Sequence, residues 1–576
     1  GQAALAANTT ASNNTAVGKS AMTANTTGDK NVAVGSLSLD ANTTGSDSVA
    51  MGYGALGTNT TGGLNVAVGK NALTTNNADA NVAVGFEALK DNTTGAGNTA
   101  VGKFALTNNT TAAKNTAIGK DAMFTNTTGA ENVSIGNDSL IYNTTGSNNV
   151  AVGVECMDAN TTGASNVGIG KSALGSNTTG TRNIAVGAYA YDASDTESDN
   201  LAIGYDAMTT NTAGGQYNVA VGNYTLDALT SGDGNVGVGY QVLSALTTGG
   251  TNTAIGYQAM MESTTGDGNT AVGNHALENN STGGSNVAVG RYALESNTTA
   301  DDNVAVGYRA AYENTTGTRN VAVGTQALDA VTTANSNTAI GHKALLLNVT
   351  SADNTAVGNQ CLDAAVSGSN TAMGSRCLTN VTTGSNNTGV GMEAGEDLTE
   401  GGTNTLIGIQ AGQHISTNGA NVCLGYRAGA TQGNLSQSLW IGRDAGAGGN
   451  DQIWIYGNSV GACVQGNNAT AWSQASDERI KKNIADSTKG LAEIDSLQVR
   501  NFEYRTEEEI TVDGLSGIYK AGTHVGAIAQ EVETVFPEAI NIGIGTQKQL
   551  KTDPIFWAMV KAIQELSAEI EILKAK

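Results

Sequence analysis

The residues best suited to chemistry lie near the end of the chain, in Ser476-Asp477-Glu478-Arg479-Ile480-Lys481. A serine hydroxyl becomes a nucleophile when a base accepts its proton, and a lysine can be that base if burial lowers its pKa towards neutrality. A spacing of five residues brings Lys481 near Ser476 if a turn intervenes, and Asp477 can orient either group. The same residues also form an ordinary helix N-cap with Lys481 on a solvated face, and the residues alone favour that interpretation.

Further motifs follow this segment in a fixed order: His524-Val525-Gly526-Ala527-Ile528-Ala529-Gln530-Glu531-Val532, then Phe536-Pro537-Glu538, then a closing helical pattern. Together with residues 476–484 they resemble the C-terminal intramolecular chaperone of phage tail spikes and tail fibres, the endosialidase type. The resemblance implies a domain that trimerises, guides folding of the β-structured fibre in front of it and then cuts itself off. It also implies that Ser476 is the nucleophile at the cut and Lys481 its base, with Asp477 beside them.

Other polar residues carry weaker signals, and none of them predicts a metal site or a cofactor. His524 is interpreted as structural, although it can also join the cleavage site. Three further histidines are scattered over the chain without carboxylate or Cys partners at ligand spacing: His275, His342 and His414. Glu393, Glu396 and Asp397 form an acidic cluster that can suggest paired carboxylates acting on sugar. A solvated loop is the preferred interpretation of that cluster.

The chain in front of these motifs repeats a unit of about seventeen residues. Its core is Asn31-Val32-Ala33-Val34-Gly35, rewritten with small variations about twenty-six times before Gly442. Side chains alternate along a strand, so the branched residues point to one face and the alanine to the other. A second apolar pair such as Ala72-Leu73 can bury another edge, and Asn59-Thr60-Thr61-Gly62 is typical of a turn with glycine at positive φ. The unit therefore predicts an all-β repeat rod, a parallel β-solenoid.

The strand motif resembles the head repeats of trimeric autotransporter adhesins, whose unit is shorter, so the resemblance covers only the strand. It implies a homotrimer. A coil this thin has little interior of its own, and burying the Val/Ile face against two sister chains would supply what one chain lacks. Stacked at about 4.8 Å, the coils would form a rod on the order of 120 Å long. Whether each coil is closed within one chain or intertwined with its sisters stays open.

Four regions are predicted: a shaft over 1–446, a transition or capping segment over 447–475, the chaperone auto-processing domain over 476–554 and a coiled-coil helix over 555–576. From Gly391 the repeat changes, with Ala-Gly replacing Ala-Leu, which indicates a tapering or capping section. After residue 476 the period is gone, and twelve of the 28 Lys and Arg lie there. This small α+β region is expected to contain alternating residues at 499–504, a turn at Asp513-Gly514 and a helix over 525–535 stopped by Pro537.

A heptad seam follows Pro554, because apolar residues there alternate steps of three and four. Its members are Phe556, Met559, Ile563, Leu566, Ile570 and Leu573. Ile at one core position and Leu at the other favours a dimer by rule, so this segment alone does not specify a trimer.

Composition excludes several classes of protein. A net charge of −23 is unsuited to nucleic-acid binding by phosphate neutralisation. No stretch approaches eighteen consecutive apolar residues, so no membrane span is predicted. Four of the five cysteines take positions that hold small residues in other repeats, and we expect buried free thiols: Cys156, Cys361, Cys377 and Cys423. The chain opens at Gly1 in mid-repeat, which reads as a fragment or a processed form.

Three functions compete. The first is the shaft of a phage tail fibre or spike, part of the virion, which attaches to a glycan or protein receptor on the host surface. The second is a cellular trimeric adhesin or extracellular filament, which explains the repeats but not the chaperone-like end. The third is a polysaccharide-cleaving tailspike, which needs inserted loops, whereas the repeat spacings allow none longer than one residue. The first is preferred, and the only enzymatic activity expected is a single-turnover self-cleavage at Ser476.

Overall fold

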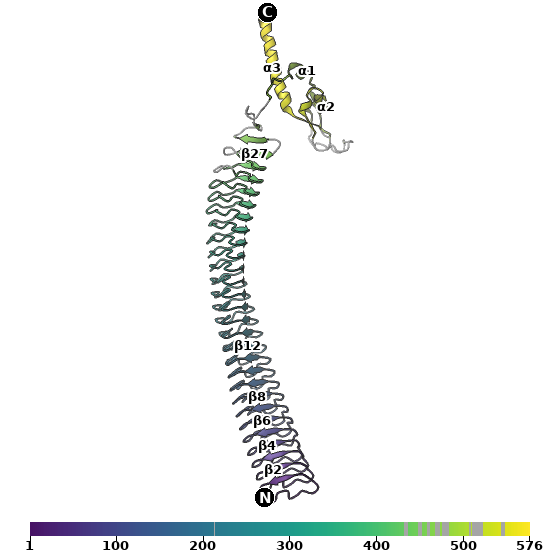
Figure 1. Ribbon diagram of the computed structural model, residues 1–576, viewed down its shortest axis with the longest axis vertical. Coiled ribbons are helices and arrows are strands. Elements are labelled where there is room, and N and C mark those ends of the chain that lie inside the picture. The colour runs from purple at the N-terminus through teal and green to yellow at the C-terminus, as the bar shows by residue number, and fades with distance from the viewer. Residues whose placement is uncertain are drawn as a thin grey trace. The chain divides into compact units, whose positions relative to one another are not determined.

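The computed structural model describes residues 1–211, 213–430, 436–446, 452–457, 461–466, 473–474, 483–505, 509, 522–542 and 548–576. The chain divides into two compact units, residues 1–474 and 475–576. The first unit is a parallel β-solenoid, an elongated and gently curved stack of coils, which confirms the predicted fold class (Figure 1).

Each coil of the described shaft contributes one strand of three residues. In chain order these are β1 (Thr15–Val17), β2 (Val32–Val34), β3 (Val49–Met51), β4 (Val66–Val68), β5 (Val82–Val84), β6 (Thr99–Val101), β7 (Thr116–Ile118), β8 (Val133–Ile135), β9 (Val150–Val152), β10 (Val167–Ile169), β11 (Ile184–Val186), β12 (Leu201–Ile203), β13 (Val219–Val221), β14 (Val236–Val238), β15 (Thr253–Ile255), β16 (Thr270–Val272), β17 (Val287–Val289), β18 (Val304–Val306), β19 (Val321–Val323), β20 (Thr338–Ile340), β21 (Thr355–Val357), β22 (Thr371–Met373), β23 (Thr388–Val390), β24 (Thr405–Ile407), β25 (Val422–Leu424) and β26 (Leu439–Ile441).

Every strand pairs in parallel with the strand of the next coil, in register, as Ala16 with Ala33 and Ala33 with Ala50. The coils are therefore closed within one chain, which settles the alternative that the sequence left open. After β26 the parallel ladder reaches β27 (Gln452–Gly457), and then β28 (Gly461–Gly466) and β29 (Ser473–Gln474) pair antiparallel. The sheet thus leaves the coil pattern at its C-terminal end.

The interior of the shaft is a column of small and medium apolar side chains. In the coil of β4, Ala67 from the strand and Ala72 and Leu73 from the following turn are fully buried. Val66 and Val68, on either side of Ala67, are only half-buried because they point to the opposite face of the strand. The predicted alternation and the second apolar pair are both confirmed.

The turn after each strand uses left-handed backbone at residues that are not glycine. Asn71 and Leu73 have φ of 59° and 52°, and the N–H of Asn71 donates to Tyr53 in the preceding coil while that of Leu73 donates to Ala88 in the following one. Left-handed backbone costs roughly 1–2 kcal/mol per residue, which these bonds between coils offset. The prediction of positive φ at Gly62 is wrong, because the Asn59 side chain donates to the Gly62 carbonyl (2.9 Å) and closes that corner without it.

Two columns of buried asparagine side chains bond each coil to its neighbours. Along one, Asn115 Oδ1 accepts from the N–H of Asn132 (2.9 Å) and Asn115 Nδ2 donates to the Gly129 carbonyl (2.9 Å). Along the other, Asn109 Nδ2 donates to Asn92 Oδ1 at 2.8 Å. These side chains satisfy backbone groups that the narrow interior would otherwise leave without partners.

The last coils exchange large and small residues across the core. Where Gly412 replaces leucine, Leu406 fills the alanine position of the strand, and a Cβ on Gly412 would lie 2.6 Å from Leu406 Cδ2. Near Gly429 the space is filled by Trp440, which is fully buried. This exchange keeps the core filled, and the parallel pairing continues from β25 through β26 to β27.

The second unit holds the helices of the described chain. Its elements are α1 (Leu491–Asp495), β30 (Arg500–Phe502), β31 (His524–Gly526), α2 (Ala529–Glu533), the 3-10 helix η3 (Pro537–Ala539), β32 (Ile540–Ile542), β33 (Lys548–Leu550) and α3 (Thr552–Lys574). A helix over 525–535 is wrong: residues 524–526 form a strand paired with β30, and α2 begins only at Ala529. The turn at Asp513-Gly514 lies outside the described residues.

Candidate functional site

The three residues predicted for self-cleavage, Ser476, Asp477 and Lys481, lie outside the described residues. Their arrangement as a serine nucleophile, its base and an orienting carboxylate stays a prediction. The described residues that follow this segment in the sequence show which surfaces of the C-terminal unit are exposed and open to a partner.

His524 packs among aromatic rings in the small sheet of β30 and β31. It lies opposite Phe502 in the register, and its ring centroid is 6.1 Å from that of Phe502 and 5.3 Å from that of Tyr504. Its Nε2 is buried and has no hydrogen-bond partner among the described residues. These contacts fit the structural interpretation of His524.

A small core fixes the base of α3 against the rest of the unit. Val532, Phe536 and Ala539 are buried with Ala558 of α3. Glu565, two turns further along α3, accepts a hydrogen bond from the N–H of Leu491 at the start of α1 (2.8 Å). The first half of α3 is therefore held by packing and by one charge-assisted bond.

The outer side of α3 carries the heptad seam, and it is exposed. All six members of the seam are exposed, with Ile563 at 64% and Leu573 at 68%. Residues 567–576 are exposed throughout, and this part of the helix runs beyond α1 and α2 (Figure 1). An isolated amphipathic segment of this length is marginal in water, so the exposed seam marks a contact surface.

An apolar hollow of about 420 Å³ adjoins the seam. Its wall includes Leu497, Leu550 and Ile555, together with Phe556 and Met559 from the seam itself. The hollow and the seam thus share two side chains and form one continuous apolar surface, which we call the α3 surface.

The outward face of the shaft strands is a second exposed apolar surface. The first strand position holds mainly Val or Thr, half-buried in most coils, and the third holds Val, Ile, Met or Leu. Many of the third residues are exposed, including Val17, Met51, Ile118, Ile203, Ile340 and Ile407. Because these exposed residues recur from coil to coil, they form a continuous apolar column along the strands. Continuous exposed apolar surfaces mark interaction sites.

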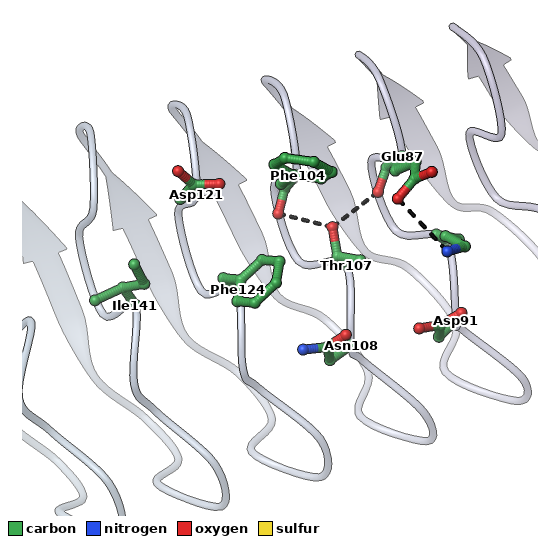
Figure 2. A pocket seen from close by; sticks show the side chains of 9 residues that line it. Glu87, Asp91, Phe104, Thr107, Asn108, Asp121, Phe124 and Ile141 are labelled. Carbon is green, nitrogen blue, oxygen red and sulfur yellow. Dashed lines mark hydrogen bonds and ion pairs between the residues drawn. The ribbon is translucent and has the colours of Figure 1, made fainter.

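A hollow of about 430 Å³ opens at another edge of the shaft, beside the turns that follow β5, β6 and β7. Figure 2 shows the rings of Phe104 and Phe124 bordering it, with Glu87 and Asp91 at one end and Asp121 nearby. The single hydroxyl hydrogen of Thr107 is shared between the carbonyls of Phe104 (2.9 Å) and Glu87 (2.8 Å), a contact that ties adjacent coils together at its floor. The hollow combines aromatic faces with carboxylate and hydroxyl groups.

The remaining polar candidates are occupied by structural pairs. Contrary to the sequence expectation, His275 contacts a carboxylate close in the chain, Glu278, with Nδ1 to Oε2 at 2.6 Å. Glu396 is buried rather than part of a solvated loop, because Arg376 pairs with it. Among the described residues no group of three or more potential ligands is placed to hold a metal ion.

The four shaft cysteines are free and buried, as expected: Cys156, Cys361, Cys377 and Cys423. Burial raises the pKa of the Cys156 thiol to about 12. Thiols with a raised pKa are poor nucleophiles, so Cys156 serves as a small core residue.

Comparison with curated proteins and with solved structures gives no match to this chain. In the described part of the chain no helix is both long and apolar enough to cross a lipid bilayer. Residues 476–541 match the family model described as chaperone of endosialidase. The C-terminal region of this chain is therefore similar to the endosialidase-type chaperone, and it follows a β-solenoid shaft in the sequence.

Proposed function

We propose that the chain is the shaft of a phage tail fibre or tail spike, exposed on the virion, which attaches to a receptor on the host surface. It acts as a homotrimer, and its C-terminal unit is an intramolecular chaperone that aligns three chains. The family match over residues 476–541 and the β-solenoid in front of it support a fibre of this kind.

The observation that carries the proposal is the exposed α3 surface directly behind the matched residues. A lone chain leaves the whole heptad seam and the adjoining hollow in water. At about 25 cal/mol per Å² of apolar area, burying several such side chains stabilises an assembly by many kcal/mol. Sister copies of α3 are the occupants that match the heptad spacing.

The shaft needs alignment because its coils are alike. Any coil can lie beside a neighbouring chain one coil out of register, since the outward Val/Ile face repeats with little change. A C-terminal assembly fixes the register at one end, and coils of the three chains then pack outward from there.

Self-cleavage makes the assembly kinetically hard to reverse. The Ser476 hydroxyl gives its proton to Lys481 and attacks a backbone carbonyl beside it, and the amine that leaves takes the proton up. Water then releases the acyl group. Once the chaperone has gone, the nucleus that assembled the shaft is no longer attached to it.

The cleavage is tested by expressing the wild type beside Ser476→Ala and Lys481→Ala and running denaturing gels. The wild type is expected to give two bands, and both variants a single full-length band. Lys482→Ala is the matched control and is expected to cut like the wild type. A wild type that stays at full length rules out self-cleavage in this chain.

The chaperone role is tested separately by expressing residues 1–475 alone. We expect this shaft to aggregate or to remain without defined mass, because nothing aligns its coils. A folded trimer from residues 1–475 alone contradicts the role.

A further inference from the structure

One edge of the shaft carries a continuous row of aromatic rings through eight consecutive coils, from Tyr189 to Tyr312. Neighbouring ring centroids are separated by 5.3 to 6.3 Å, so each ring contacts the next. We call this row the tyrosine ladder. One histidine, His275, takes part in it between Tyr257 and Tyr292.

Apart from Tyr312, which lies five residues after the repeat glycine Gly307, the ladder rings occupy two adjacent positions of the coil. Residues directly after the repeat glycine are exposed, and they are Tyr205, Tyr240, Tyr257 and Tyr308. Residues one place later are half-buried beneath them, and they are Tyr189, Tyr224, His275 and Tyr292. The half-buried rings thus support the exposed rings that lie above them.

The ladder lies at a solvent-facing edge of the coil. In five other coils the residue directly after the repeat glycine is a lysine (Lys19, Lys70, Lys103, Lys120 and Lys171), and in others it is an exposed apolar residue such as Val154, Met392 or Ile409. Lysine is almost never fully buried without a partner, so this column of the coil lies at the surface of the assembled shaft. The exposed rings therefore need an external ligand to explain them.

Carboxylates lie among the rings. Glu278 contacts His275 at 2.6 Å. Asp227 follows Tyr224 by three residues, and its Oδ1 is buried without a hydrogen-bond partner among the described residues, so it lies beneath the ring surface. Tyr224 and Asp227 stand in the coil where Phe104 and Thr107 stand at the hollow of Figure 2. This edge thus combines aromatic faces with hydrogen-bond acceptors.

We propose that the tyrosine ladder binds a neutral polysaccharide that lies along the shaft. The C–H face of a pyranose packs on the electron-rich face of an aromatic ring, and the phenol hydroxyls of the exposed tyrosines exchange hydrogen bonds with its hydroxyls. The ring spacing is comparable with the length of one sugar unit in an extended chain, so successive units meet successive coils. The carboxylates and the net charge of −23 disfavour an anionic glycan.

This inference rests on the proposed attachment to a host surface and names the class of receptor and the residues that bind it. It concerns binding only. A site for cleaving sugar would need paired carboxylates free of structural partners, and the ladder offers rings in their place.

The test is affinity electrophoresis of the full chain in native gels that contain barley β-glucan, dextran, galactomannan or xylan. We expect retardation in at least one of the four gels. The double variant Tyr240→Ala, Tyr257→Ala removes two exposed rings and is expected to weaken binding about tenfold or more. Hyaluronan, an anionic glycan, is expected to give no retardation.

Tyr142→Ala and Tyr217→Ala are the matched controls, since both tyrosines are exposed and neither belongs to the ladder. They are expected to bind like the wild type. Circular dichroism and light scattering on every variant confirm fold and assembly. Absence of retardation in all four gels, or equal retardation of wild type and double variant, overturns the inference. If binding fails in this way while the mass of the assembly is unchanged, the proposed fibre function is not contradicted.

Discussion

Buried asparagines hold neighbouring coils together through both ends of the side-chain amide. Replacing Asn115 by Ala leaves the N–H of Asn132 without a partner in a fully buried site and removes one of the two bonds to the Gly129 carbonyl, which still accepts from Asn126 Nδ2. An unpaired buried N–H costs about 1–3 kcal/mol, so we expect a loss of this size in the free energy of unfolding. Chemical unfolding followed by circular dichroism measures it.

The matched control is Asn359→Ala, because Asn359 is exposed and its side-chain amide contacts His342 at the surface. It is expected to change stability by less than about 0.5 kcal/mol. Equal losses at the two positions would show that the buried column does not hold the coils together.

Asp227 gives the shaft a dependence on pH. Burial, with Asp206 as a further negative neighbour, raises the pKa of Asp227 to about 6 in the folded chain. Between the ordinary value of 3.8 and 6 the folded state binds more protons than the unfolded state, so this group makes the shaft less stable as pH rises through that window. Asp227→Asn is therefore expected to raise the unfolding temperature at pH 7 but not at pH 4.

Thermal unfolding at both pH values checks this, with the exposed Asp302→Asn as control. A gain at pH 4 as large as that at pH 7 contradicts the assignment.

At the residue level, regular positions could be predicted and irregular ones could not. Cys156 was placed correctly because it replaces an alanine in a strict repeat. The tyrosine ladder escaped prediction because its rings shift between two positions, with Tyr205 and Tyr224 nineteen residues apart and Tyr224 and Tyr240 sixteen. A search for residues one or two places after each repeat glycine would have found it.

Helix α3 exposes an apolar seam that none of the described residues of its own chain covers. The double variant Ile563→Asn, Leu566→Asn puts polar amides into the exposed seam while leaving Ala558 and Glu565, which hold α3 to its unit, in place. We expect it to reduce the assembled mass in multi-angle light scattering and the yield of folded shaft. Ser567→Ala, on an exposed position outside the seam, is expected to assemble normally.

Elements were predictable where periodicity determined them. The strands and α3 follow from periods of two and of three to four residues. Residues 524–528 misled the prediction, because the apolar run His524-Val525-Gly526-Ala527-Ile528 suits a strand as well as a helix, and pairing with β30 decided it. The closed coil also needed the structure, since only the bonds of Asn59 and Leu73 show how the chain turns back.

The whole molecule joins a stack of nearly identical coils to a unit with an unfilled apolar surface. The sequence indicated both parts, and the family match over residues 476–541 supports the second. Ser476, Asp477 and Lys481 could be named only through a resemblance, because the residues alone favour an ordinary helix start.

The most direct measurement is the mass in solution of Ser476→Ala, uncut and therefore intact, beside that of residues 1–475. The account predicts three chains for the intact protein and no defined trimer for the shaft alone. An intact protein that runs as a single chain, with α3 still exposed to solvent, contradicts it.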